Sequence, residues 1–217
     1  MNGETEKPVL ASLFDRHGRM FSEELGIDLM RGTPAPLFQW LCAALLMSAR
    51  IPSERAMQAA GALKDAGWTT ARHMADSRWE DRVKVLNGAG YARFDESAAR
   101  MLGETADLLV SDYGGDLRRL RERAEYDPAN EKRLLQEFKG IGYVGADIFL
   151  REVQCVWGEL YPFADRKALE TSEKLGLPET PGGLAALVSR KDFPRLVAAL
   201  VRAALAKDLD GIRQEAS

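Results

Sequence analysis

The residues whose types and spacing could do chemistry lie between Phe138 and Asp165. This stretch begins with a glycine-rich turn, Phe-Lys-Gly-Ile-Gly-Tyr, and ends on a carboxylate, Asp165. A carboxylate beside a reacting carbon can stabilise positive charge there and can orient or deprotonate a water molecule. Asp165 is also a suitable helix N-cap, because Arg-Lys-Ala-Leu follows it. The two roles are compatible, since a capping aspartate is held rigidly.

Two predicted helices flank the glycine-rich turn. The first runs from Pro128 to Phe138: Asp127 can cap it, proline suits a first helical turn, and the apolar residues fall at helical spacing. The second runs from Val144 to Val156, again with apolar residues at helical spacing. Because only Lys-Gly-Ile-Gly-Tyr lies between them, the sequence predicts a helix–hairpin–helix.

A turn this tight requires backbone of positive φ, which we expect Gly140 and Gly142 to supply. We expect Ile141, between them, to be buried as the contact that pins the two helices together. The second helix then begins with backbone amides that no side chain covers. Such amides at the positive end of a helix dipole form an anion site suited to a phosphate, with no cationic side chain required.

The remaining chain is predicted to be helical as well, so the fold class is all-α. Leu37 to Ala49 is a strongly apolar helix, and Thr33 to Pro36 marks a boundary before it, since two prolines in that register break a helix. A long helix from Glu96 to Tyr113 is stopped by Gly114 and Gly115. We find no alternating strand pattern and no internal repeat.

Composition places the chain among ordinary globular proteins and excludes several classes of site. Of 217 residues, 46% are hydrophobic and 29% charged, and no apolar run approaches transmembrane length. The first residues lack the pattern of an export signal, and Cys42 and Cys155 fit reduced core positions, so we expect a cytoplasmic protein. Two cysteines are too few for a four-thiolate iron–sulfur cluster, and the isolated His17 and His73 predict no metal site.

The segment Phe138-Lys139-Gly140-Ile141-Gly142-Tyr143-Val144-Gly145-Ala146, with Asp165 after it, resembles a known family. In the helix-hairpin-helix DNA glycosylases, the superfamily of endonuclease III, the hairpin is Leu-Pro-Gly-Val-Gly-x-Lys-Thr-Ala and an essential aspartate follows. The stretch from Pro36 to Arg50 resembles that family's first barrel helix, and Gly88 to Tyr91 its Ile-Gly-Leu-Tyr loop. Spacing agrees from about Pro36 to Leu169.

The resemblance implies a fold of two helical domains. Residues 36–154 would form a six-helix barrel domain that contains the helix–hairpin–helix. Residues 1–35 and 155–217 would form a second helical domain from both chain ends. The pocket for a base would lie in the cleft between the two domains.

The resemblance also implies a set of DNA contacts. Arg50 takes the place of a glutamine that some relatives push into the duplex, although an ordinary surface arginine is an equally good interpretation. Trp40 and Tyr91 could stack on a flipped base, but aromatic residues on apolar helices more often belong to the core. The hairpin would contact the DNA backbone through the following residues: Lys139, Gly140, Ile141, Gly142, Tyr143, Val144 and Gly145.

By the same resemblance, the expected function is base-excision DNA repair by a monofunctional DNA glycosylase. Asp165 would be the catalytic carboxylate that hydrolyses the N-glycosidic bond of a damaged or alkylated base. Members that also cut the strand carry a lysine where this chain has Val144, and valine cannot form a Schiff base. Adenine-mismatch relatives carry a glutamate where this chain has Ala43, which argues against that specificity.

The expected partner is double-stranded DNA, bound by a monomer without a cofactor. The resemblance allows a monovalent cation at the hairpin carbonyls when DNA is bound. The net charge of −3 predicts that the contact is local and that affinity for undamaged DNA is modest. The arginines between Arg118 and Arg123 could touch phosphate or form a solvated helix face. The acidic surface and the missing lysine favour a rival interpretation, a catalytically inactive DNA-binding or scaffold protein with the same fold.

Overall fold

The computed structural model describes residues 3–216, with side chains from Glu6 onward, and every regular element in that range is helical. The all-α prediction is therefore confirmed. The helices of the N-terminal half are α1 Gly3–His17, α2 Phe21–Glu24, α3 Pro34–Met47, α4 Ser53–Asp65, α5 Ala71–Ala75, α6 Trp79–Gly88 and α7 Asp95–Tyr113. They are followed by α8 Leu117–Arg123, α9 Pro128–Leu135, α10 Tyr143–Val153, α11 Arg166–Lys174, α12 Pro181–Ala185, α13 Phe193–Ala206 and α14 Leu209–Glu215.

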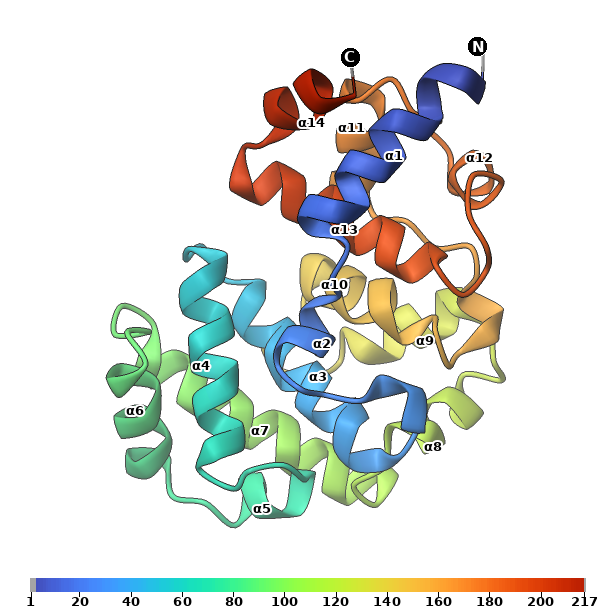
Figure 1. The fold of residues 1–217 in the computed structure, drawn as a ribbon. Helices are drawn as coiled ribbons and strands as arrows, with labels where there is room; N and C mark the ends of the chain where they lie inside the picture. The colour runs from blue at the N-terminus through green and yellow to red at the C-terminus, as the bar shows by residue number, and fades with distance from the viewer. Residues whose placement is uncertain (1–2, 217) are drawn as a thin grey trace.

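Helix α3 is the centre of the lower group of helices in Figure 1. It is apolar on all sides, and its residues from Pro36 to Leu46 are buried, with Gln39 partly so, against α4, α7, α8 and α10. The predicted boundary at Thr33 to Pro36 needs correction, because α3 begins at Pro34. Proline is compatible with the first helical turn, where its missing N–H has no intrahelical partner in any case.

The predicted ends of several helices agree with the structure. Gly114 ends α7 in the left-handed region, at φ 61°, as its glycine predicts. Asp127 caps α9 by accepting a hydrogen bond from the Asn130 amide at 2.8 Å. Helix α10 is shorter than predicted and stops at Val153, after which the chain turns toward Asp165.

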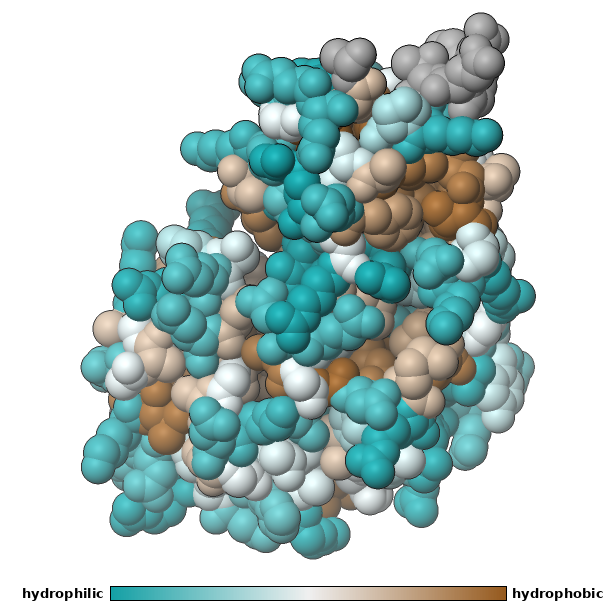
Figure 2. Space-filling view, in the orientation of Figure 1, coloured by the Kyte–Doolittle hydropathy of each residue, from teal (hydrophilic) through white to brown (hydrophobic). Residues whose placement is uncertain are grey.

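The two chain ends lie together in the upper group of Figure 1, where α1 packs on α13 and α14. Ser12 Oγ donates to Glu215 Oε2 at 2.6 Å, and the Arg16 guanidinium forms two 2.8 Å hydrogen bonds with the Asp208 carboxylate. The face shown in Figure 2 is mostly hydrophilic, with hydrophobic side chains in separate patches. Within residues 3–216, no helix is both long enough and apolar enough to cross a membrane.

Helix α10 joins the two groups, since it packs on α3 and also on α13. Its Glu152 is fully buried and accepts hydrogen bonds from the backbone amides of Phe21 and Ser22, at 2.7 and 2.9 Å. Burial raises the pKa of Glu152 above its usual value, while these donors act in the opposite direction. A shared central helix draws no clear line at residue 154, and the division of the chain into two domains stays a prediction.

Candidate functional site

The hairpin between α9 and α10 has the buried pin that the sequence predicts. Ile141 is buried, and its amide donates to Phe138 O at 3.0 Å. Gly140 has φ 84°, and a Cβ built there would lie 2.9 Å from the Met101 sulfur and 3.1 Å from Leu45 side-chain atoms. Glycine is therefore required at position 140 for two reasons, backbone conformation and space.

Gly142 differs from the prediction, because its φ is −85° and its ψ −167°. This is extended backbone, and Gly142 is the N-cap of α10, a position that ordinarily adopts such angles. The expected positive φ at this position is wrong. A Cβ at Gly142 would meet no atom within 4 Å, and no side chain of the described residues caps α10. The consequence of glycine here is that the first amides of α10 are left uncovered.

Alanine substitution should separate these two glycines. Gly140→Ala is expected to lower the free energy of unfolding by ~2 kcal/mol, because it combines backbone strain with a contact against Met101 and Leu45. Gly142→Ala should leave stability nearly unchanged but reduce affinity for a phosphodiester, since its methyl group would stand beside the open amides. Urea denaturation and anisotropy titration with a short duplex measure the two effects. Equal destabilisation by both substitutions would contradict this account of the turn.

The hairpin presents a largely exposed tip. Tyr143 and Val144 are 64% and 57% exposed, and Lys139 is exposed as well. The Lys132 ammonium group lies 3.5 Å from the centroid of the Tyr143 ring, a cation–π contact. Two hairpin carbonyls accept hydrogen bonds from neighbouring elements. Lys139 O accepts from Thr105 Oγ1 of α7 at 2.9 Å, and Gly140 O accepts from Ser48 Oγ, at the end of α3, at 3.5 Å.

A pocket of about 690 Å³ opens beside this tip. Four parts of the chain line it, and they are the α3–α4 junction, α10, the start of α11 and the end of α13. The lining residues are Met47, Ser48, Ala49, Ile51, Ser53, Tyr143, Val144, Asp147, Ile148, Arg151, Asp165, Arg166, Lys167, Val201 and Leu205. The hairpin tip and the candidate carboxylate, distant in sequence, therefore meet at one pocket.

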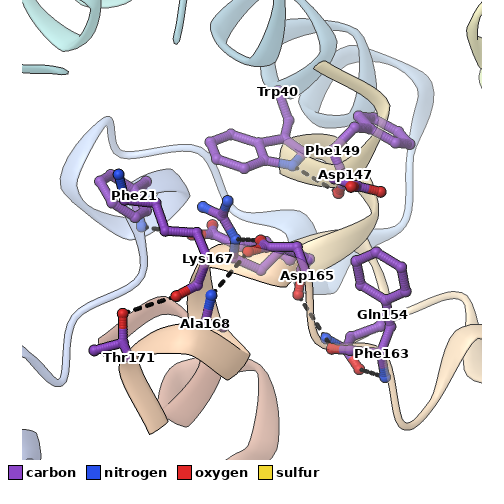
Figure 3. Close-up of polar contacts among 12 residues, drawn as sticks. Phe21, Trp40, Asp147, Phe149, Gln154, Phe163, Asp165, Lys167, Ala168 and Thr171 are labelled. Carbon is purple, nitrogen blue, oxygen red and sulfur yellow. Dashed lines mark hydrogen bonds and ion pairs between the residues drawn. The ribbon is translucent and has the colours of Figure 1, made fainter. Parts of the chain in front are cut away.

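Asp165 has both of the roles that its sequence context left open. Its Oδ1 accepts from the Ala168 amide at 3.0 Å, which caps α11 as predicted, and its Oδ2 accepts from Arg151 Nε at 2.5 Å (Figure 3). The residue is 6% exposed and lines the pocket. Gln154 fixes the chain just before it through two hydrogen bonds with the Phe163 backbone, at 2.9 and 3.0 Å. Asp165 is thus a rigid cap that also faces a cavity.

Asp147 and Arg151 are site residues that our sequence reasoning missed. They lie four positions apart on α10, both buried and both lining the pocket. Asp147 Oδ1 accepts from Lys132 Nζ at 2.5 Å. Burial raises the pKa of Asp147, the Lys132 hydrogen bond opposes that shift, and the nearby Asp165 charge adds to it. Polar residues spaced by one turn on an otherwise apolar helix were the signal in the sequence.

Trp40 and Tyr91 belong to the core, and the prediction that they form the base pocket is wrong. Trp40 is fully buried and its Nε1–H donates to Phe149 O at 3.0 Å. Tyr91 is buried too, its hydroxyl donates to Leu46 O at 2.9 Å, and burial raises its pKa to about 12. Both aromatic rings pack inside the lower group of helices, Trp40 as part of α3 and Tyr91 against it. The aromatic residue that the structure places at the pocket is Tyr143.

The predicted arginine contacts have different surroundings. Arg50 is exposed in the α3–α4 junction, between the pocket residues Ala49 and Ile51, and its contact with DNA stays a prediction. Arg118 forms hydrogen bonds with Asp116, and Arg121 forms a two-point ion pair with Glu159. These two arginines of the 118–123 cluster are held by carboxylates of the protein itself.

Comparison with known proteins gives one structural likeness. No family model matches the sequence, and no curated protein matches it. A solved structure, a trapped endonuclease III–DNA covalent intermediate in an estranged-adenine complex, is similar with a TM-score of 0.48 and 15% sequence identity. The similarity covers 75% of this chain and 71% of that one.

Proposed function

We propose that this protein is a monofunctional DNA glycosylase that removes a damaged base flipped out of duplex DNA, with Asp165 as the catalytic carboxylate. The observation that carries the proposal is the meeting of two features at one pocket. The uncapped start of α10 is suited to a DNA phosphate, and Asp165 lines the cavity beside it. The hairpin motif and the trailing aspartate in the sequence support the same function.

The hairpin would position the strand. Backbone amides from Gly142 onward donate to a phosphate without the help of a cationic side chain, which suits a protein of net charge −3. Lys139 and Arg50, both exposed, would add contacts to the DNA backbone. Tyr143 at the tip can pack on a sugar or a base edge. Extrusion of the target base would bring it into the 690 Å³ pocket.

Asp165 would then lie next to the deoxyribose. Cleavage of the glycosidic bond develops positive charge on C1′, and a fixed carboxylate stabilises that charge and orients the attacking water. Each oxygen of Asp165 accepts one hydrogen bond from the protein, which leaves lone pairs for water or for the sugar. The Arg151 and Ala168 contacts hold the group in place, so little reorganisation is needed during the reaction.

The proposed activity stops at an abasic site. Val144 lines the pocket at the position where strand-cutting relatives carry a lysine. Lys167 also lines the pocket, two residues after Asp165, and is the amine to examine for any covalent intermediate.

The rival function is DNA binding without turnover. Its support is that both oxygens of Asp165 already have protein partners, an arrangement that also suits a purely structural cap. The rival and the enzyme predict the same binding surface and differ only in turnover.

Incubation of the protein with duplexes that each carry one damaged or alkylated base tests the proposal. For at least one base we expect strand breaks only after alkali treatment, and no covalent complex after borohydride reduction. Breaks without alkali, or a borohydride adduct lost in Lys167→Gln, would show lyase activity instead. Tight binding with no alkali-labile product across a broad panel would favour the non-catalytic rival.

A further inference from the structure

Arg151 has hydrogen-bonding capacity that the protein does not use. The residue is 3% exposed, and its Nε donates to Asp165. The guanidinium also lies over the Phe21 ring, with Cζ 5.9 Å from the centroid, a contact that occupies none of its N–H groups. Nη1 is fully buried and has no acceptor, and no acceptor for Nη2 is present among residues 3–216. A guanidinium presents five N–H donors in a fixed fork, and a buried donor without an acceptor is costly. Nη2 is not fully buried, so it is the donor at the pocket that an acceptor on a ligand can reach.

Asp147 supplies the complementary group. Lys132 occupies Oδ1, and among the described residues no donor contacts Oδ2. Residues four apart on a helix lie on the same face, so the Asp147 carboxylate and the Arg151 fork stand one above the other along α10. Both line the pocket. The wall of the pocket formed by α10 therefore offers an acceptor beside a donor.

We propose that Asp147 and Arg151 together recognise a base edge in which an N–H adjoins a carbonyl, with Asp147 accepting from the N–H and Arg151 donating to the oxygen. This inference rests on the proposed function and narrows its substrate to lactam or imide bases. Such an edge is present in uracil, thymine, hypoxanthine and oxidised purines. It is absent from adenines alkylated on the ring, which carry no carbonyl.

The reaction itself favours the same class. When the C1′–N bond breaks, its electron pair stays on the base, and a water molecule adds its hydroxyl to C1′ and loses a proton to Asp165 or to solvent. A lactam base leaves as an anion whose charge spreads onto the carbonyl oxygen, and the base later takes a proton from solvent. The Arg151 guanidinium beside that oxygen would stabilise the developing charge. A cationic alkylated base leaves as a neutral molecule and gains nothing from a guanidinium.

Matched duplexes that contain uracil or 3-methyluracil opposite the same partner base test whether the protein recognises this base edge. They differ only in the N–H that Asp147 would bind. We expect the wild-type protein to excise uracil at least ~10-fold faster, the discrimination typical of one well-placed hydrogen-bonding group. Asp147→Asn should slow uracil excision and bring the ratio close to one. Asp107→Asn, which removes an exposed carboxylate from α7, is the control for charge and should keep the wild-type ratio.

Two outcomes would refute recognition of the base edge by Asp147 and Arg151 and would still leave the protein a glycosylase. One is faster excision of 3-methyladenine than of any lactam base by the wild-type protein. The other is an unchanged uracil preference in Asp147→Asn. If the wild-type protein cuts neither duplex, binding decides the inference; the proposed function itself fails only if no base of the wider panel is excised. The non-hydrolysable 2′-fluoroarabino forms of the two nucleotides should then still differ ~10-fold in Kd for wild type and not for Asp147→Asn. Equal Kd values of the wild-type protein for the two duplexes would refute recognition of the base edge.

Discussion

Asp165→Asn is expected to lower the excision rate by roughly 10²- to 10⁴-fold while leaving affinity for duplex DNA almost unchanged. The amide keeps an oxygen for the Ala168 N–H, so the cap of α11 survives. It loses the negative charge that would stabilise the sugar cation and polarise water. Single-turnover excision followed by alkali treatment measures the rate, and anisotropy measures affinity.

The same substitution carries a stability effect that must be measured beside the rate. The Arg151–Asp165 pair is buried on both sides, with side-chain exposures of 4% and 5%. Removing one partner leaves a buried guanidinium without its counter-ion, which costs about 3 kcal/mol in comparable sites. Excision is therefore compared well below the unfolding midpoint of the variant. Asp127→Asn, the same change at the exposed cap of α9, is the control and should affect neither rate nor midpoint strongly. A folded Asp165→Asn protein that excises at the wild-type rate would refute catalysis by this carboxylate.

The second large effect concerns a buried acid on α9. Glu131 is fully buried, and no donor of the described residues contacts its carboxylate oxygens, whereas a protonated Glu131 can donate to Glu159. Burial, with a smaller contribution from the nearby Glu159, raises the pKa of Glu131 to about 8. The unfolded chain would return this group to its ordinary pKa near 4.5.

The direction of the pH effect follows from proton binding. Below pH 4.5 both states hold the Glu131 proton, and the stabilisation linked to it is complete. Between pH 4.5 and 8 the unfolded chain releases the proton while the folded protein keeps it, so the free energy of unfolding falls as pH rises. Each pH unit between those two values changes the free energy of unfolding by about 1.4 kcal/mol, so the total decline is about 5 kcal/mol. Above pH 8 the group ionises in both states, and this contribution to the slope ends.

Glu131→Gln should abolish that part of the pH dependence, because glutamine cannot ionise. The variant is expected to be more stable than wild type at pH 8, by ~5 kcal/mol, and close to it at pH 4.5. Urea unfolding at intervals from pH 4.5 to 8.5 gives both curves. Glu137→Gln, an exposed acid paired with Arg133, serves as the control and should run parallel to wild type. Parallel curves for Glu131→Gln and wild type would show that Glu131 is ionised in the folded protein.

Local signals in the sequence determined the helices and their ends. Asp127 and Asp165 cap the helices that follow them, and Gly114 stops α7, because each of these effects involves atoms only a few residues apart. The buried Ile141 between two helices was predictable for the same reason. Fold class and the hairpin therefore came from the sequence alone.

Only the tertiary structure decided which side chains meet at the pocket. Aromatic Trp40 and Tyr91 are as compatible with a pocket as with a core, and their burial among the lower group of helices settles the choice. The partner of Asp165 is Arg151, which lies in the last turn of α10. The segment that follows α10 folds back and places Asp165 against it. Helical periodicity identifies the face on which a residue lies but not the element that covers that face. For this reason the sequence was sufficient to predict the hairpin and the Asp165 cap. The arrangement of Asp147, Arg151 and Asp165 around one pocket depends on the packing of the whole chain.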